Sequence, residues 1–473
     1  MTLTRRIAHN TFYQTLGRII STILGLVVFG LLARYLGTDG YGQYSTVIAF
    51  IQIFAVVLDL GLYIILIKKI SEPDAPVERI VNNVFTLRFF SAIIFLSLAP
   101  IVALFFPYPA PIKIGIAITT LSYLFISLNQ VLTGLFQKNL QMNKIAVAEV
   151  VGRIALLAAT GAVLFFHLNL YAVFGSVIAG SLANFLYVFI SAHKFVRLRF
   201  TFDWPIWRQV LSESWPIGLS VALNLIYFKA DTVILSLYRP AADVGIYGAT
   251  YKVLEVLVTI PAMFAGLIMP LITAAFVVKD LERFRFVMQR AFDFLAMMAL
   301  PLIGGTVFIA TPLMVLVAGG EFSAAGSVLK ILVVATGIIF IGSLFGNAVV
   351  AVNRQKPMIW IYLAVAVISL TGYLILIPRY SYYGAAGVTV ASETMIMLGS
   401  YFMVNRAAQL KLRFGKIGKM VLATAVMSGA LWLSRDLSWL WLVPIGLGVY
   451  VVCLYLFRVV SKAELKEILS LSR

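Results

Sequence analysis

The chain has 473 residues, of which 62% are hydrophobic and only 12% are charged, and its formal net charge is +18. Soluble proteins average about 45–50% apolar and about 25% charged residues, so this composition excludes a soluble globular fold. The single cysteine, Cys453, excludes an intrachain disulfide and a thiolate metal cluster.

Apolar segments long enough to cross a bilayer follow one another along almost the whole chain. A hydrocarbon core of about 30 Å needs roughly 20 apolar residues per helix. The segments are continuously apolar and do not alternate, which favours helices over a barrel. The sequence therefore predicts an all-α polytopic membrane protein with about fourteen transmembrane helices, at 12–35, 42–67, 82–106, 112–136, 145–166, 169–192, 212–237, 245–276, 291–317, 325–350, 357–377, 384–404, 419–434 and 439–457.

Positive charge gathers in every second connector between these spans. Of the 37 Lys and Arg residues, 26 fall in the termini and connectors of one side and five in those of the other. Such asymmetry sets membrane orientation, so the pattern predicts an inner (cytoplasmic) membrane protein with both termini in the cytoplasm. The same reading explains the basic balance without nucleic acid, which we do not expect as a partner.

The longest connector, 193–211, divides the chain near its middle. It is basic and aromatic, which is typical of a segment that lies along the inner membrane surface. We expect an N-terminal lobe at 1–192, this cytoplasmic amphipathic linker, a C-terminal lobe at 212–404, and two extra helices with a tail at 405–473.

An internal repeat supports the division into two lobes of six helices each. The segment LLARYLGTDGYGQY resembles VILSLYRPAADVGIY, so that Gly42 and Tyr44 correspond to Gly245 and Tyr247. Both halves would enter the membrane in the same orientation. Parallel repeats of this kind are typical of transporters, with the substrate path between the halves.

Three arginines lie inside predicted spans, where a charge is costly unless it is paired, snorkels or faces water. Arg18 shares a helical face with Gln14 and Gly25, which favours the protein interior, with snorkelling as the alternative. Arg88 has no acidic residue one turn away, so a substrate-facing role and snorkelling remain open. Arg153 follows Glu149 by four residues, which favours an intrahelical pair.

The seventh and eighth spans carry the densest set of intramembrane polar groups. Lys229 lies on a different face from Asp231, and Lys252 and Glu255 are three residues apart, so they could pair with each other or across the hairpin. One polar face of the seventh span is formed by Ser220, Asn224, Tyr227 and Asp231.

Asp59 and Glu393 are intramembrane carboxylates without an oppositely charged neighbour in sequence. Together with Asp231 and Glu255 they are candidates for ion coupling or for pairing with a buried cation. Proton coupling predicts that transport stops when the proton gradient is collapsed.

Motifs for chemistry are missing from the sequence. There is no phosphate-binding loop of the G-x-x-x-x-G-K-[ST] type, no H-E-x-x-H and no Cys/His cluster. We therefore expect no catalytic residues, no metal and no cofactor.

Two stretches carry a resemblance to a known family. The segment from Gly17 to Leu62, with A-x-x-L-G-x-x-x-Y-G from Ala33 to Gly42, resembles the N-terminal hairpin of oligosaccharide flippases. The segment from Asp231 to Glu255 is similar to their second-lobe hairpin. These flippases form the polysaccharide transport family of the multidrug/oligosaccharidyl-lipid/polysaccharide exporter superfamily.

The resemblance implies two six-helix lobes in a V around a central charged cavity, plus two C-terminal helices. It implies alternating access that moves a polyprenyl-pyrophosphate-linked glycan to the outer leaflet, with membrane lipids, a polysaccharide polymerase and chain-length machinery as partners. Substrate-facing candidates are Arg18, Arg88, Asn224, Tyr227, Lys229 and Lys252.

Two other functions stay open. A cation-coupled drug or small-molecule exporter of the same superfamily predicts an aromatic and acidic cavity. A membrane enzyme that polymerises or ligates lipid-linked sugars predicts a large outer loop, whereas the outer connectors here are a few residues each.

Overall fold

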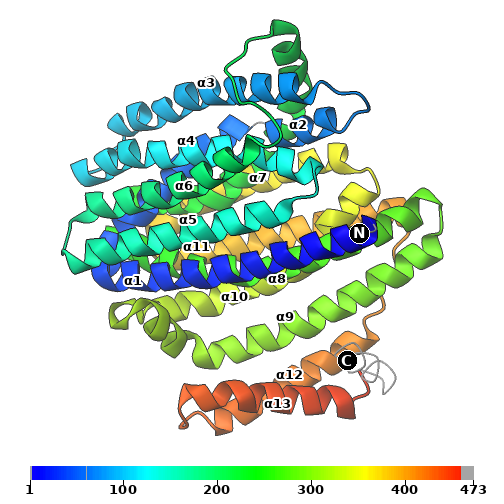
Figure 1. Cartoon of the computed structure of the whole chain (residues 1–473). Helices are drawn as coiled ribbons and strands as arrows, with labels where there is room; N and C mark the ends of the chain where they lie inside the picture. Colours follow the sequence, from blue (N-terminus) through cyan, green and yellow to red (C-terminus); the bar gives the residue numbers. More distant parts are fainter. Residues whose placement is uncertain (1–2, 60, 460–473) are drawn as a thin grey trace. The chain divides into compact units, whose positions relative to one another are not determined.

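The computed structural model describes residues 3–59 and 61–459, and its side-chain detail excludes 3–12, 56, 57, 59, 216, 217 and 219–228. The described chain is helical apart from its connectors (Figure 1). The helices are α1 (Leu3–Asp59), α2 (Leu62–Ile70), α3 (Val77–Leu104), α4 (Ala110–Lys138), α5 (Met142–Phe165), α6 (Leu170–Ala192), α7 (Trp204–Tyr238), α8 (Ala241–Val277), α9 (Leu281–Ala318), the 3-10 helix η1 (Gly320–Phe322), α10 (Ala325–Ala351), α11 (Gln355–Ala408), α12 (Gly415–Leu433) and α13 (Trp439–Leu456).

The first of the two longest helices, α1, is a helical hairpin. It is broken at Gly37, which has φ 64°. The rings of Phe29 and Tyr41 lie 5.4 Å apart, whereas a straight helix would separate residues twelve apart by about 18 Å. Glycine suits this joint because it adopts positive φ without a Cβ clash.

The second hairpin is α11, which is broken at Ser381 with φ 50°. The hydroxyl of Tyr373 lies 3.4 Å from that of Thr389, sixteen residues later, so the chain reverses here too. The first hairpin contains the predicted span 12–35 and most of 42–67, and the second contains 357–377 and 384–404. In the described residues, eleven helices are long and apolar enough to cross a membrane, both hairpins among them.

The order of helices confirms the predicted all-α polytopic membrane fold. The second predicted span is divided, because α1 ends at Asp59 and α2 begins at Leu62 behind Gly61 at φ 74°. The seventh starts earlier than expected, since α7 begins at Trp204 and not at 212. The connector after α6 is correspondingly shorter, 193–203.

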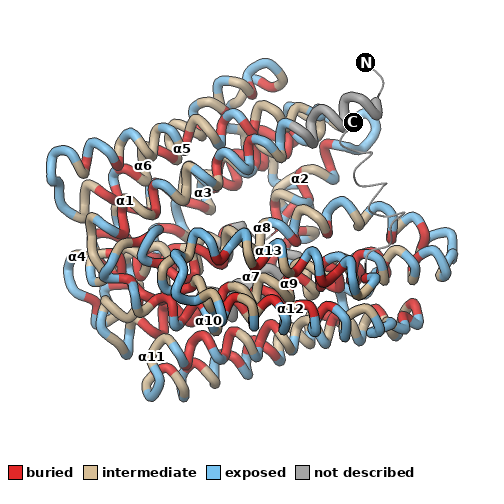
Figure 2. The backbone as a smooth tube through the Cα atoms, turned by 90° about the horizontal axis from the view of Figure 1, so that it is seen from below, coloured by how far each residue is buried: buried red, intermediate tan, exposed pale blue. Residues whose placement is uncertain are grey.

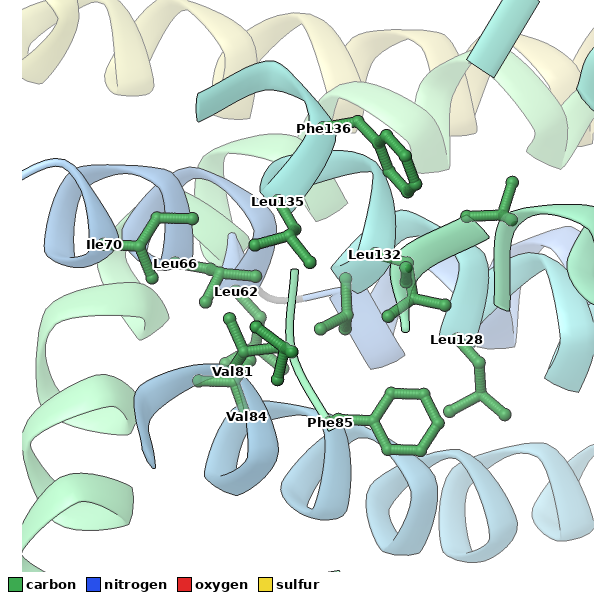
Figure 3. Close-up of a cluster of buried hydrophobic side chains, with 14 of the residues drawn as sticks. Leu62, Leu66, Ile70, Val81, Val84, Phe85, Leu128, Leu132, Leu135 and Phe136 are labelled. Atoms are coloured by element: carbon green, nitrogen blue, oxygen red, sulfur yellow. The ribbon is translucent and has the colours of Figure 1, made fainter. Parts of the chain in front are cut away.

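The chain forms two compact units, of which the first is Met1–Gly248 with Val317–Gly319. It thus contains α7 and the first turns of α8. One of its cores joins α2, α3 and α4, where Leu66, Val81 and Leu132 are almost fully buried (Figure 3). The first part of α3, 80–88, is buried at every position, whereas buried and exposed residues are interspersed along the rest of α3 and along α4 (Figure 2).

The second unit is Ala249–Leu316 with Gly320–Arg473. Its larger core is formed by α8, α9, α10 and α11 and includes Phe284, Leu344 and Val404. A smaller core attaches α12 and α13 to α9 and buries Cys453. Tyr450 of α13 also donates a hydrogen bond to the carbonyl of Met297, 3.0 Å away.

Candidate functional site

The second half of α1 crosses the first turns of α8 at Gly42 and Gly245. A Cβ on Gly42 would lie 1.7 Å from the carbonyl oxygen of Ala241, and one on Gly245 would lie 2.0 Å from that of Thr38. Each glycine therefore faces the residue four positions before the other. This reciprocal geometry is what two copies of one motif would produce, and it joins the two motifs whose similarity the sequence indicated.

Asp231 of α7 is buried beside this crossing, within the same unit. The hydroxyl of Tyr247 donates to its Oδ2 at 2.6 Å. Its Oδ1 accepts from the backbone N–H of Thr232 and from the Thr232 hydroxyl at 3.1 Å. The side chain is 1% exposed, so these bonds replace water around the carboxylate. The aspartate thereby ties α7 to the start of α8.

Tyr44, the equivalent tyrosine of the first motif, makes a different contact. Tyr44 stacks on Phe174 of α6, with ring centroids 6.0 Å apart and planes 13° apart. The glycine crossing is thus symmetric, whereas Tyr247 donates to a carboxylate and Tyr44 stacks on an aromatic ring.

Lys229 is half-buried on α7 and interacts electrostatically with Asp231. The predicted polar face of α7 includes Asn224 and Tyr227, whose side chains lie outside the described residues. Their substrate-facing role therefore stays a prediction.

Lys252 and Glu255 form an ion pair on α8. The ammonium lies 2.9 Å from Oε2 of Glu255, and the two side chains are 39% and 36% exposed. Of the arrangements left open by the sequence, the intrahelical pair is present. Lys252 lies eleven residues into α8, about 16 Å along the helix, so the pair sits at depth in an apolar span.

Arg18 is exposed on α1, and its carbonyl accepts a hydrogen bond from Thr22 at 2.7 Å. Electrostatic interactions link Glu149 of α5 to both Arg18 and Arg153. Glu149 and Arg153 thus attract each other, although no ion pair within 4.0 Å joins them in the described part of the chain, and the intrahelical pair stays a prediction. The Arg153 guanidinium lies against α1, where a Cβ on Gly25 would be 3.5 Å from it. The result is a charged cluster between α1 and α5.

Arg88 of α3 is 1% exposed and is surrounded by protein acceptors. Its guanidinium donates to the Ser127 hydroxyl at 2.6 Å, to the Leu58 carbonyl at 2.9 Å and to the Gln130 side chain. Leu58 lies in the last turn of α1, which ends at Asp59. A cation is favourable there because the last carbonyls of a helix carry partial negative charge. Snorkelling to the membrane surface is thus not its arrangement.

Glu393 of α11 is buried, and its Oε1 has no hydrogen-bonding partner among the described residues. It interacts electrostatically with Tyr362 on the other arm of the same hairpin. The side chain of Asp59 lies outside the described residues. Arg18, Arg88, Lys229 and Asp231 belong to the first unit, and Lys252, Glu255 and Glu393 to the second.

Sequence reasoning missed the groups that hold these charges. Ser127 and Gln130 are three residues apart on α4 and so share the face that meets Arg88. That spacing was a visible signal. Nothing local pointed to Tyr247 as the partner of Asp231, because their sixteen-residue separation crosses a hairpin.

A family model described as polysaccharide biosynthesis protein matches residues 7–276, more than half of the chain. The chain belongs to this polysaccharide biosynthesis protein family. No curated protein matches this family member.

Solved structures of similar fold include a lipid II flippase and transporters of the MOP superfamily. The lipid II flippase MurJ in an inward closed conformation has a TM-score of 0.80 and 16% identity, over 94% of this chain and 98% of that one. An inward-facing MATE-family multidrug resistance transporter has a TM-score of 0.66 and 13% identity, over 84% of this chain and 97% of that one. A MOP-superfamily transporter from Pyrococcus furiosus has a TM-score of 0.61 and 15% identity, over 86% of this chain and 96% of that one. At such identities the likeness shows the fold, which this family member shares.

Proposed function

We propose that this polysaccharide biosynthesis protein flips a polyprenyl-pyrophosphate-linked oligosaccharide from the inner to the outer leaflet of the cytoplasmic membrane. The observation that supports this most is a set of incompletely buried cations inside apolar spans: Arg18 on α1, Lys229 on α7 and Lys252 on α8. A chain retains such charges in a membrane where they face water or a charged ligand.

The chemistry of the substrate fits these cations. A pyrophosphate and its sugar cannot enter hydrocarbon, whereas Arg and Lys can neutralise the phosphates and hydrogen-bond to sugar hydroxyls. The polyprenyl tail remains in the lipid throughout. No bond is made or broken, so transport needs no nucleophile. Sugars linked this way would be consumed outside by polymerase and chain-length machinery.

In the proposed cycle of alternating access, the glycine crossing would belong to a closed state. With Gly42 against Ala241 and Gly245 against Thr38, the first hairpin and the start of α8 have no room for a ligand between them. Passage to the outer leaflet requires these segments to separate. The Tyr247–Asp231 hydrogen bond lies next to the crossing and would favour the closed arrangement.

Ion coupling is assigned to the carboxylates. Glu393 is the strongest candidate because it is buried and its Oε1 accepts no hydrogen bond from the described residues. Asp59, Asp231 and Glu255 stay candidates for the same role or for pairing with cations. Protonation of one of them would link return of the empty carrier to the ion gradient.

A second candidate function is supported by the fold similarity to MATE transporters. As a cation-coupled exporter of small molecules, the protein would use the acids rather than the bases for its ligand. The two functions differ in which charges are required.

The test is a leaflet assay of a labelled lipid-linked oligosaccharide in proteoliposomes. We expect Arg18→Ala and Lys229→Ala to lower the flipping rate at least about tenfold, because each removes a charge-assisted contact. Lys356→Ala, at an exposed lysine in the first turn of α11, serves as the control and should keep the rate. A collapsed proton gradient should stop net transport.

An unchanged flipping rate in both Arg18→Ala and Lys229→Ala would overturn the proposal that these cations bind the substrate. Loss of drug efflux in Asp231→Asn, with no glycan flipping by the unaltered protein, would favour the small-molecule exporter.

A further inference from the structure

Two connectors of the chain carry nearly the same short sequence, which differs only by Arg or Lys at its first position. Arg197-Leu198-Arg199-Phe200 follows α6, and Lys411-Leu412-Arg413-Phe414 follows α11. Each comes directly after the last helix of a predicted six-helix repeat. The two segments, here called connector A (196–200) and connector B (410–414), lie in different units and can be compared residue by residue.

The burial pattern of the two connectors is the same. Val196 and Leu410, which precede the motif, are 3% and 0% exposed. Leu198 and Leu412 are half-buried and pack on the core of their own unit. All four basic residues are exposed, and the phenylalanines are 62% and 60% exposed. Alternation of this kind indicates an extended backbone that turns its apolar side chains inward and its cations outward.

An amide side chain holds each backbone in this shape. In connector A, Asn82 of α3 donates to the Arg197 carbonyl at 3.1 Å and accepts from the Arg199 N–H at 3.2 Å. In connector B, Gln289 of α9 donates to the Arg413 carbonyl at 3.1 Å and accepts from the Arg413 N–H at 2.8 Å. One amide thus replaces the neighbouring strand that an extended segment would otherwise need.

A phenylalanine three residues after each amide contacts the connector. Phe85 lies 6.1 Å from Phe200, and Phe292 lies 6.0 Å from Phe414, between ring centroids. An amide and a phenylalanine three apart share one face of a helix. The third helix of each predicted repeat therefore presents the same two groups to the same motif.

The basic side chains of both connectors are not used in ion pairs within the part of the chain that the structure describes. Residues two apart on an extended strand have Cα atoms about 6.6 Å apart and point the same way. Two cations at this spacing can contact one phosphodiester group. The adjacent exposed phenylalanine offers an apolar surface to acyl chains, as interfacial aromatic side chains do.

We propose that connectors A and B are docking sites for the phosphate headgroups of anionic phospholipids in the leaflet that they face. Charge complementarity selects the headgroup. Orientation signals need only a number of positive charges on one side of the membrane. That requirement does not explain a clamped backbone and an exposed phenylalanine built twice, whereas headgroup docking does.

The test is native mass spectrometry of the full chain, released from micelles with equal phosphatidylglycerol and phosphatidylcholine. We expect phosphatidylglycerol to be retained in preference. Arg197→Gln with Arg199→Gln, or Lys411→Gln with Arg413→Gln, should each lower its retention roughly twofold, since one of two similar sites is lost, and all four changes should abolish the preference.

A matched control is available in Arg354 and Lys356. They are exposed, basic and two residues apart at the start of α11, but Lys356 is helical and no phenylalanine follows them. Their change to Gln should leave retention unaltered; a loss as large as that of connector A would overturn the proposal and leave charge number alone as the cause.

Two further arms test the geometry and the source of the phosphate. Asn82→Leu keeps every cation but removes the clamp, so it should lower retention about as much as the charge changes in connector A; unaltered retention in a variant with native elution from size exclusion would refute the clamp. Displacement of phosphatidylglycerol by inorganic pyrophosphate at micromolar concentration would assign the sites to a soluble phosphate and overturn lipid docking.

Discussion

At the scale of single residues, the intramembrane charges fall into two kinds. Arg88 and Asp231 are buried and hydrogen-bonded to named protein groups. Arg18 and the Lys252–Glu255 pair are exposed or partly exposed. Burial with every nitrogen satisfied is typical of a group that positions helices, whereas exposure inside an apolar span is typical of contact with water or substrate. The sequence predicted the same substrate-facing role for Arg88 and Arg18, whereas their burial in the structure assigns them to different kinds.

Arg88 gives a prediction about stability. Arg88→Met should lower the free energy of unfolding by about 3–5 kcal/mol, because it strands the Leu58 carbonyl and two polar side chains in the core. Arg88→Lys keeps the charge beside the Leu58 carbonyl and should cost less. Thermal unfolding of the detergent-solubilised protein measures both. Equal midpoints for the unaltered protein and the Met variant would show that the network contributes nothing.

At the scale of elements, α1 and α8 contact each other through backbone atoms at two glycines. The second half of α1 and the start of α8 approach so closely that backbone meets backbone at Gly42 and Gly245. Small residues permit such approach in membrane proteins, where packing and not the hydrophobic effect draws helices together. A second contact also occurs twice in the chain: Asn82 forms hydrogen bonds to the backbone of connector A, and Gln289 forms them to the backbone of connector B.

The crossing gives a second prediction. Gly42→Ala should lower stability by about 1–3 kcal/mol, because its Cβ would overlap the Ala241 carbonyl and force the helices apart. It should also slow flipping in the leaflet assay, since the closed state no longer forms. Gly175→Ala is the matched control: a Cβ there meets nothing within 4 Å. A neutral effect at both glycines would mean that the crossing adjusts without cost.

At the scale of the whole molecule, the charge asymmetry predicts orientation. Of 37 Lys and Arg residues, 26 lie on the predicted cytoplasmic side. The chain has a single, buried cysteine, Cys453, so Cys453→Ser gives a background without thiols. In that background a cysteine at Lys356 should react with a membrane-impermeant maleimide only after the membrane is opened. A cysteine at Arg435 should react in intact cells, and the reverse result would invert the topology.

The membrane class and the order of the spans can be read from the amino-acid sequence alone, which also predicts an internal repeat. These follow from continuous apolar length and from local similarity, which need no knowledge of neighbours in space. It also singled out Asp231, Arg88 and the Lys252–Glu255 pair, because a charge is conspicuous within an apolar span.

Only the tertiary structure decided what each charge contacts. Tyr247 donates to Asp231, the Leu58 carbonyl accepts from Arg88, and the Arg153 guanidinium lies against α1. The amides Asn82 and Gln289 likewise reach connectors more than one hundred residues away in sequence. The physical reason is that hydrogen bonds and close backbone approach depend on which helix faces are brought together, and a single apolar span presents nearly the same hydrophobicity on every face.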